Sequence, residues 1–560
     1  MLRLAPALAI GVLLAPVAFG VLATLLPALG YLPSLGGHQF TFKYFAALLA
    51  FPGLGRSVLL SLATGLITTL VALVIVITFV SGWYGTRAFL RVQHIISPLL
   101  SVPHAAAAFG LALLIAPSGF FFRLISPSLT GTTRPLDLFI LNDPFGLAMM
   151  AGLVAKEIPF LLLVTLAALP QTKARLSGQV AQGMGYGRIS GFIFVTWPLV
   201  YRQIRLAVFA VIAYATSVVD VAVILGPLTP PPLSVRLTQW MSDPDISLRF
   251  IASAGALLQL LVTIGAIAIW ILGEKLLSRL VASHRNAGRR YAMDNWVRSL
   301  GLGMIVTAAC IIFLGLALLA LWSVAGFWAF PDTLPRGFTL GNWSRVLPSL
   351  SSPLATTLWT GLVATLIAVA LALGCLEREA RTGRKGGSKA LLFVYLPLIV
   401  PQVSFVFGLQ LFFLGVGLDA TWGSLVLVHL VFVLPYVFLS LSDPWRAWDT
   451  RYASISHGLG ASPNRTFWRV RLPMLLKPAL VASAVGFAVS VGQYLPTLLI
   501  GGGRWPTITT EAVALASGGD RRVIGVYAFV QMVLPFVGFA LATLVPAFLF
   551  RNRNDMKASS

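Results

Sequence analysis

The chain carries the stretch Gln179-Val-Ala-Gln-Gly-Met-Gly185, which is followed by Trp197-Pro198. The same spacing of glycine and proline recurs in Ser454-Ile-Ser-His-Gly-Leu-Gly460, which is followed by Leu472-Pro473. The two final glycines lie 275 positions apart, and so do the two prolines. Because the spacing is kept through the whole of each loop, it indicates that the chain is a duplication. Each copy is a polar loop between hydrophobic segments, so the duplicated unit includes the segments on either side.

The composition is that of a membrane protein. Hydrophobic residues make up 58% of the 560 residues and charged residues only 10%, which leaves too little polar surface to cover a soluble globule. The net charge of +23 therefore bears on membrane topology and not on nucleic-acid binding. Cys310 and Cys375 lie in or at the end of apolar runs, and we expect neither a disulfide framework nor a metal site.

The sequence contains twelve apolar runs long enough to cross a bilayer, for which about 20 residues are needed. The first run follows Arg3 and imitates a secretory signal, but it is longer than a usual signal core and we expect a retained helix. The predicted fold is an all-α integral membrane protein with about twelve transmembrane helices. Their approximate extents are 4–29, 57–80, 95–116, 145–169, 206–228, 250–273, 299–325, 353–375, 390–415, 421–442, 478–500 and 523–549.

Basic residues are distributed unevenly between the two sides of the membrane. With the amino terminus inside, the inner segments hold 28 of the 40 Lys and Arg residues and the outer loops hold 11, which sets the orientation by the positive-inside rule. An even number of helices then places both termini and both glycine-centred loops in the cytoplasm. Six helices per copy in the same orientation form a parallel repeat. The predicted units are residues 1–274, a basic cytoplasmic linker at 275–298, and residues 299–560.

One stretch is similar to a known family of membrane proteins. This stretch is Leu459-Gly-Ala-Ser-Pro-Asn-Arg-Thr-Phe-Trp-Arg-Val-Arg-Leu-Pro473. It resembles the loop by which importer permeases of the ABC class dock on their ATPase. The family's loop has the pattern Glu-Ala-Ala, three further residues, Gly, and then a Leu-Pro pair. The whole chain resembles the fused permeases of ferric-iron and thiamine importers, in a group that includes sulfate, molybdate and polyamine permeases. It departs from the Glu-Ala-Ala pattern at 179–181 and 454–456, so the contact of the family's glutamate is not carried over.

Each loop is predicted to form two short helices set at an angle. Gly185 and Gly460 permit the bend, and Pro198 and Pro473 suit the first turn of the next helix, where a missing N–H costs little. The arginines between bend and proline, Arg471 included, could pair with acidic residues of an ATPase or could reflect only the positive-inside bias. The predicted docking residues are Gln179, Ala181, Gly185, Arg188, Pro198, Ser454, Ser456, Gly460, Arg465, Arg469 and Pro473.

No energy source is evident in the sequence. The stretch Gly383-Arg-Lys-Gly-Gly-Ser-Lys389 lacks the spacing of a phosphate-binding loop and follows no strand. We expect no catalytic site, metal or cofactor in this chain, and ATP hydrolysis by a separate ABC ATPase subunit in two copies. The longest outer loops, near 117–144 and 326–352, are too short for a solute-binding domain. The resemblance therefore implies an extracytoplasmic solute-binding protein as a further partner, and a bacterial inner membrane as the location.

Polar side chains inside the apolar runs are candidates for the translocation pathway, because an ionised group at a helix centre costs about 2.5–3.5 kcal/mol. Lys156 and Glu157 could serve the pathway, or could form an interhelical ion pair, for example with Asp220. His104 and His429 are expected to be interhelical hydrogen-bond partners and not metal ligands. In the family the fifth helix of each half lines the pathway, and Ser217, Ser490, Gln493 and Thr497 are predicted to lie in these helices. The pore candidates are Lys156, Glu157, Ser217, Asp220, Ser490, Gln493 and Thr497.

Three classes of function remain for such a chain. The twin loops favour an ATP-driven importer permease. The buried ionisable residues would suit an ion-coupled secondary transporter, which is the alternative. A membrane-embedded enzyme would need clustered His, Asp or Glu residues at a membrane face, and the sequence shows none. We predict an importer permease for a small solute of the thiamine-like or ferric-iron-like class, although no pore side chain specifies the solute.

Overall fold

The structure, a computed structural model, describes residues 3–286, 290, 295–383 and 387–551. Within these residues ten helices are long and apolar enough to span a membrane, and two bent pairs of helices bring the number to twelve. The described strands form one short antiparallel hairpin, β1 (Tyr31–Leu32) with β2 (Gly37–His38). The predicted all-α membrane fold with about twelve spans is confirmed.

The first half of the chain contributes six spans and several short helices between them. Its helical elements are α1 (Ala5–Ala28), η1 (Pro33–Leu35), α2 (Lys43–Leu49), α3 (Leu54–Trp83), α4 (Arg87–Ile96), η2 (Ser97–Ser101), α5 (His104–Ile115), α6 (Phe120–Ile125), α7 (Leu147–Ala168), η3 (Pro170–Thr172), α8 (Ala174–Gly183), α9 (Arg188–Gly191), η4 (Phe192–Thr196), α10 (Trp197–Ser217), α11 (Asp220–Leu225), α12 (Leu233–Met241) and α13 (Leu248–Asn286).

The second half repeats this order of elements. Its helical elements are α14 (Asn295–Val324), α15 (Gly341–Thr382), α16 (Ser388–Ile399), α17 (Gln402–Gly415), α18 (Trp422–Arg446), α19 (Arg451–Gly458), α20 (Pro463–Thr466), η5 (Phe467–Arg471), α21 (Leu472–Met474), α22 (Leu476–Val491), α23 (Leu495–Gly501), α24 (Ile508–Ala514), η6 (Leu515–Ser517) and α25 (Arg521–Leu549). In this order α1 corresponds to α14, α3 to α15, α7 to α18, α10 to α22 and α13 to α25.

Side chains from the connecting loops cap several of these helices. The Thr86 hydroxyl accepts the Phe89 N–H at the start of α4, and the Thr421 hydroxyl accepts the Ser424 N–H at the start of α18. Asp143 accepts the N–H groups of Leu147 and Ala148 in the first turn of α7 and that of Phe145 just before it. These acceptors satisfy donors that have no partner within the helix, so they fix where the spans begin.

Several predicted spans are wrong in their boundaries. The runs at 95–116 and 390–415 are each interrupted at a proline, and α16 and α17 meet at 88°. The fifth span of each half also breaks: α10 ends at Ser217 and α22 at Val491, before the short helices α11 and α23. By contrast, α15 covers 42 residues and far exceeds the predicted 353–375. An apolar run shows that a segment is buried in the membrane, but not that it is one straight helix.

The predicted basic linker at 275–298 is largely helical where the structure describes it. Helix α13 continues to Asn286 and α14 begins at Asn295. Residues 287–289 and 291–294 of the linker, and 384–386 of the basic loop, lie outside the described residues. The long helices extend beyond the roughly 20 residues that a bilayer requires, so the basic segment continues the span as a helix.

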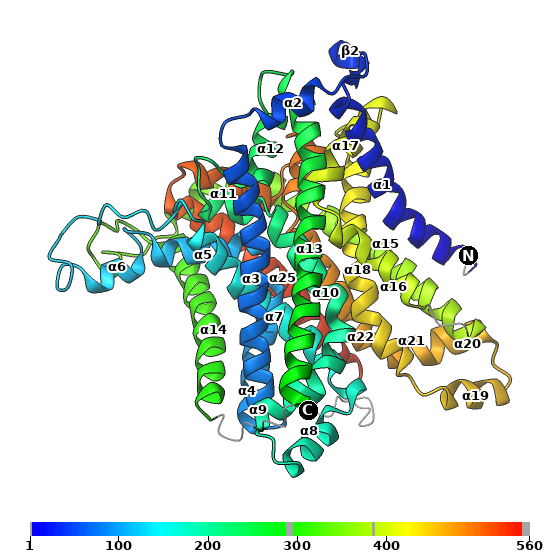
Figure 1. The fold of residues 1–560 in the computed structure, drawn as a ribbon. Helices are drawn as coiled ribbons and strands as arrows, with labels where there is room; N and C mark the ends of the chain where they lie inside the picture. Colours follow the sequence, from blue (N-terminus) through cyan, green and yellow to red (C-terminus); the bar gives the residue numbers. More distant parts are fainter. Residues whose placement is uncertain (1–2, 287–289, 291–294, 384–386, 552–560) are drawn as a thin grey trace.

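The two halves exchange their first helices. Helix α1 packs along α17 of the second half, and α14 packs along α5 of the first half (Figure 1). Small residues make both crossings close: a Cβ added at Gly110 would lie 2.7 Å from the Gly315 carbonyl carbon, and Gly408 meets the backbone of Gly20. Such small-residue contacts let membrane helices approach backbone to backbone. The halves are therefore held together by reciprocal packing.

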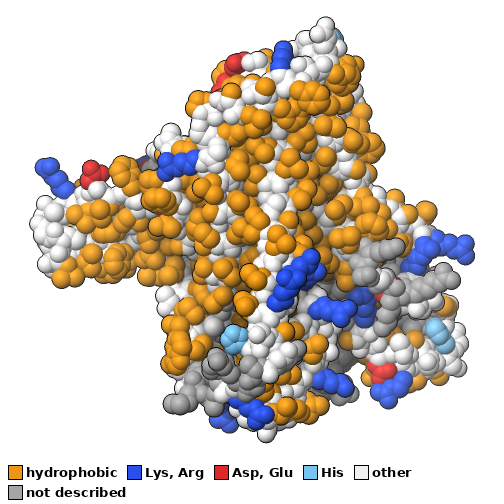
Figure 2. Space-filling view, viewed as in Figure 1, with side chains coloured by type: hydrophobic (Ala, Val, Ile, Leu, Met, Phe, Trp, Pro, Cys, Tyr) orange, Lys and Arg blue, Asp and Glu red, His pale blue; other side chains and the backbone are white. Residues whose placement is uncertain are grey.

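The short helices between the spans lie at the two ends of the bundle. In Figure 1 α8 and α19 project from the lower end, while the β1–β2 hairpin and α2 lie at the upper end. Figure 2 shows that hydrophobic side chains cover the middle of the visible face, whereas most Lys and Arg side chains lie near the lower end. This distribution is typical of a membrane protein whose middle section is surrounded by lipid.

Candidate functional site

The two predicted loops have the same sequence of elements. In the first, α8 is followed by Gly185, α9, the π-helical turn η4 at Phe192–Thr196, and Pro198 in the first turn of α10. In the second, α19 is followed by Gly460, α20, the π-helical turn η5 at Phe467–Arg471, and Pro473 in the first turn of α21. The π-helical turns are offset by the same 275 positions as the glycines, so the repeat extends to backbone conformation.

Both glycines lie in the left-handed region that the bend requires. The φ angle is +85° at Gly185 and +78° at Gly460. The Gly185 N–H donates to the Gln182 carbonyl and the Tyr186 N–H donates to the Ala181 carbonyl. These two bonds form a Schellman motif, in which glycine at the position after the helix ends the helix and turns the chain. Gly460 and Ala461 make the equivalent bonds to His457 and Ser456.

The inside of each corner is closed by one pair of side chains. In the first loop Ala181 packs on Gly191, where an added Cβ would lie 3.0 Å from the Ala181 Cβ. In the second loop the equivalent residues are Ser456 and Thr466, whose hydroxyl oxygens lie 2.9 Å apart. Ala181 and Ser456 are buried. They were predicted among the docking residues, but here they hold the two arms of each loop together and do not face outward.

Each corner also exposes two large apolar residues that the sequence analysis did not single out. Val180 and Met184 are 57% and 55% exposed in the first loop, and Ile455 and Leu459 are 60% and 84% exposed in the second. They occupy equivalent positions four residues apart, so each pair lies on one face of its helix. Exposed Gln179 and Ser454 lie beside them. The signal available in the sequence was an apolar residue at the same two positions of both polar loops.

The predicted arginines separate into three environments. The Arg188 guanidinium donates to the Tyr84 carbonyl at 2.5 Å, which connects the first loop to the end of α3. Arg465 and Arg469 are exposed. Arg471 is buried and forms an ion pair with Glu377 of α15 at 3.2 Å, with its guanidinium over the Trp445 and Trp448 rings. Arg471 therefore fastens the second loop to the bundle and is not available to a partner.

An acidic residue lies just before α19. Asp449 accepts hydrogen bonds from the backbone N–H and the side chain of Arg451, at 2.9 and 2.7 Å. These hydrogen bonds hold the pKa of the Asp449 carboxyl below its usual value. The carboxylate thus stays ionised at the amino-terminal end of α19, where the helix dipole favours a negative charge.

Lys156 and Glu157 are both buried in α7 and have different partners. The Lys156 ammonium donates to the carbonyls of Leu99 and Val102 at 2.9 and 2.5 Å, where the third span is interrupted before α5. Glu157 accepts a hydrogen bond from Thr68 at 3.2 Å, and its second oxygen has no partner among the described residues. Within residues 3–286 no ion pair joins Lys156, Glu157 and Asp220. The interhelical ion pair considered from the sequence is therefore not formed.

The break in the fifth span of the first half holds an acid and two rings. Asp220 begins α11 and is buried, and its carboxyl group lies near the Tyr214 hydroxyl. The His104 ring lies 4.7 Å from the Tyr214 ring. Tyr214 also lies within the range of electrostatic interaction with Asp220 and Glu157, and Tyr494 of the second half lies within that range of Asp220. Ser217 bonds only to carbonyls of its own helix among the described contacts. We call Asp220, Tyr214, His104, Glu157 and Tyr494 the central polar cluster.

The corresponding region of the second half is neutral. The His429 ring is bonded through Nδ1 to the Ser490 hydroxyl at 2.8 Å and through Nε2 to the Thr497 hydroxyl at 2.9 Å. Thr497 lies in α23 and Gln493 in the break before it, so neither is in the fifth helix as predicted. His429 is an interhelical hydrogen-bond partner, as expected. The described residues contain no group of three or more His, Cys, Asp or Glu that could hold a metal ion.

Known proteins with similar sequences are permeases. The family "Binding-protein-dependent transport system inner membrane component" matches residues 364–553. The inner membrane ABC transporter permease protein YnjC of Escherichia coli is 32% identical over 518 residues, which is 92% of each chain. The molybdenum transport system permease protein ModB of Mycobacterium tuberculosis is 28% identical over 177 residues, 29% of this chain and 66% of the relative. The spermidine/putrescine transport system permease protein PotC of Haemophilus influenzae is 25% identical over 152 residues, 27% and 59% respectively. The chain therefore belongs to the family of binding-protein-dependent ABC transporter permeases of the inner membrane.

Proposed function

We propose that this permease carries a small solute from an extracytoplasmic binding protein to the cytoplasm, driven by a separate ATPase present in two copies. One ATPase copy binds the α8–Gly185 corner and the other binds the α19–Gly460 corner. The supporting observation is that both corners present the same exposed apolar pair on a backbone bend fixed by the same two hydrogen bonds. A repeated rigid projection suits two identical partners.

The proposal includes a topology and a division of the chain. Both termini and both corners face the cytoplasm, in agreement with the distribution of basic residues. The repeats are residues 1–274 and 299–560, joined by the segment 275–298. The chain itself holds no cofactor, since ATP is bound and hydrolysed by the partner.

For the solute, the central polar cluster supports a cation, which includes the thiamine-like and ferric-iron-like classes. Asp220 and Glu157 are buried carboxyl groups without a cationic side chain paired to them in the described residues. A passing cation would supply the missing charge, and the Tyr214 and Tyr494 rings beside Asp220 offer electron-rich faces to it. Of the relatives, PotC is named for spermidine and putrescine and ModB for molybdenum.

An ion-coupled secondary transporter is the second candidate, and the unpartnered oxygen of Glu157 favours it. A buried carboxyl group that gains and loses a proton is a common element of such transporters. That class does not account for the two equivalent corners, which would then be connecting loops without a partner.

Site-directed cross-linking to the ATPase tests the first proposal. In a chain with Cys310→Ala and Cys375→Ala, a bifunctional thiol reagent should join Leu459→Cys, and separately Met184→Cys, to cysteines in the groove of the ATPase. Leu418→Cys, exposed in the loop between α17 and α18, is the matched control and should not react with the ATPase. Equal cross-linking at Leu418 and Leu459, or none at either corner, would exclude the proposed docking.

A further inference from the structure

A lateral projection extends from the side of the bundle, beside the carboxy-terminal end of α14 (Figure 1). It consists of residues 117–140, which include α6, and residues 326–340, and we call it the wing (Figure 1). The first segment belongs to the first half of the chain and the second to the other half. The corresponding loop after α17 is short, since α18 begins at Trp422, so the duplication has only one such projection.

The two segments of the wing are fastened to each other by Arg123. This residue is 3% exposed, and its guanidinium donates to the carbonyls of Ser118, Ala329 and Asp332 at 3.0, 2.7 and 2.9 Å. The Trp328 ring lies 5.0 Å from it. Arg521 of α25 adds bonds to Ser118. A buried cation with carbonyl partners on both segments and an aromatic partner on the second makes the wing one rigid unit.

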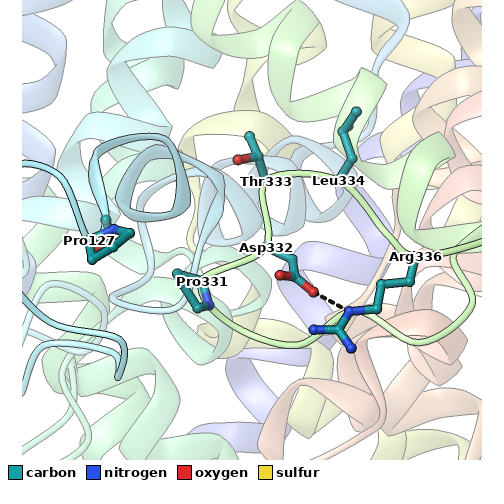
Figure 3. A pocket seen from close by; sticks show the side chains of 7 residues that line it. Pro127, Pro331, Asp332, Thr333, Leu334 and Arg336 are labelled. Carbon is teal, nitrogen blue, oxygen red and sulfur yellow. Dashed lines mark hydrogen bonds and ion pairs between the residues drawn. The ribbon is translucent and has the colours of Figure 1, made fainter.

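One side of the wing is polar. A hollow of about 500 Å³ opens between the two segments, lined by residues such as Ser126, Asp332 and Thr333. Figure 3 shows the ion pair between Asp332 and Arg336 in the wall of this hollow. The Arg336 Nε lies 2.7 Å from the Asp332 Oδ2. In Figure 2 the charged side chains of the wing lie along its upper edge.

The wing also exposes several large apolar side chains. On α6, Phe121 and Leu124 are 52% and 53% exposed, whereas the intervening Phe122 and Arg123 are buried. The loop after α6 adds Leu129 and Phe139, 81% and 80% exposed. Hydrophobic side chains cover the lower surface of the wing in Figure 2 and continue onto the apolar sides of the spans. An exposed apolar surface of this kind marks a contact with a partner or a membrane.

The backbone of the wing limits how deep it can lie. Residues 131–140 form neither helix nor strand, and irregular backbone is not tolerated in the hydrocarbon core because its N–H and C=O groups would lose their partners. The exposed Arg134 and Asp137 exclude the core for the same reason. An apolar lower side, a charged upper edge and an irregular backbone together fit the boundary between headgroups and acyl chains.

We propose that the lower side of the wing rests on the bilayer surface, with Phe121, Leu124, Leu129 and Phe139 inserted at the boundary of headgroups and acyl chains. If α8 and α19 are cytoplasmic, the contacted leaflet is the outer one. The identity of the leaflet is the one part of this inference that rests on the proposed function. The wing then fixes the position of both halves against the membrane, on the membrane face away from the docking corners. The charged upper edge and the hollow remain accessible from solution.

Depth-dependent quenching tests this contact. The full-length permease with Cys310→Ala and Cys375→Ala receives one cysteine, labelled with the fluorophore NBD, in nanodiscs that contain lipids brominated at carbons 6 and 7 of the acyl chain. We expect Phe139→Cys and Leu129→Cys to be quenched at least twofold more than Arg134→Cys, and more strongly by this lipid than by one brominated at carbons 11 and 12. All three sites are exposed, so labelling should not disturb the fold.

Two results would overturn the inference. Quenching at Phe139 that is as weak as at Arg134 would place the apolar side in water. A blue shift at Phe139 that needs the purified extracytoplasmic binding protein, without quenching by brominated lipid, would assign this surface to that protein instead. Neither result depends on ATP or on uptake, so a failure of the wing proposal and a failure of the proposed transport function are distinguishable.

Discussion

The hydroxyl oxygens of Ser456 and Thr466 lie 2.9 Å apart at the inside of the second corner, at the positions that Ala181 and Gly191 occupy in the first. One corner is closed by a buried hydrogen bond and the other by apolar contact between small residues. The outward face nevertheless carries an apolar pair at the same register in both. The duplication has therefore kept the shape of the corner while its internal chemistry changed.

The bend at each corner should be needed for coupling but not for folding. A valine at Gly460 loses access to the observed φ of +78° at a cost of about 1 kcal/mol or more, which is small beside the stability of the packed helices. We expect Gly460→Val to reach the membrane in normal amounts, to bind the ATPase weakly and to lose uptake, with Gly185→Val similar and milder. Co-purification of the ATPase, membrane abundance and uptake are measured together.

Gly458→Val and Gly183→Val are the matched controls for these variants. Each control lies two residues before the bend, with nothing within 4 Å of an added Cβ and without a positive φ. They should retain ATPase association. If the bend variants behave like these controls, the left-handed conformation is not required for docking.

The exposed apolar pairs should supply much of the docking energy. Burying a large apolar side chain contributes about 1.5–3 kcal/mol, so Leu459→Asp should weaken ATPase binding about tenfold or more. Met184→Asp should act in the same direction. Leu418→Asp, on an exposed loop, should leave binding unchanged. Titration of the purified ATPase onto the permease in nanodiscs gives the affinities, and unchanged affinity for Leu459→Asp would mean that the corner is not buried by its partner.

The buried and the exposed arginines of the second loop should differ in their effect on stability. Removing one partner of a fully buried ion pair costs about 3–5 kcal/mol. Arg471→Ala leaves Glu377 with the more exposed Arg381 at 2.7 Å and removes the cation that lies over Trp445 and Trp448. It should therefore lower membrane abundance and the thermal unfolding temperature, with a loss of stability smaller than that full cost. Arg465→Ala and Arg469→Ala should leave both near normal, because these side chains are exposed. Fluorescence-detected chromatography after heating would measure all three, and equal stability would contradict the assigned role of Arg471.

The central polar cluster should affect uptake without affecting docking. Asp220→Asn removes the charge but keeps the size of the side chain, and we expect uptake of a cationic solute to fall at least tenfold while ATPase binding stays normal. Asp137→Asn, an exposed acid in the wing, is the control. Uptake of the solute held by the binding protein is measured at several concentrations. Wild-type uptake in Asp220→Asn would remove the support for a cationic solute.

The sequence predicts local features of this fold better than distant contacts. The bends at Gly185 and Gly460 and the positions of Pro198 and Pro473 follow from backbone requirements of single residues, and all four are found where expected. The break after Ser217 was missed because no glycine or proline lies between Ser217 and Asp220 to interrupt the apolar pattern.

Long-range partners could not be read from the sequence. Nothing in the spacing of Arg465, Arg469 and Arg471 distinguishes the third, whose carboxylate partner Glu377 lies 94 positions away. From the sequence, an interhelical ion pair was one of the two roles considered for Lys156. In the structure its partners are the Leu99 and Val102 carbonyls. These carbonyls are available because the third span is interrupted there. Such contacts depend on how helices break and cross.

Reconstituted uptake is the most direct test of the central claim that a separate ATPase drives this permease through both corners. Proteoliposomes with the permease, the ATPase and the solute-loaded binding protein should accumulate solute only with ATP on the ATPase side, whether or not a proton or sodium gradient is imposed. Met184→Asp and Leu459→Asp should each reduce that uptake strongly. Accumulation by the permease alone, driven by an ion gradient without ATP, would contradict the account and assign the chain to the secondary transporters.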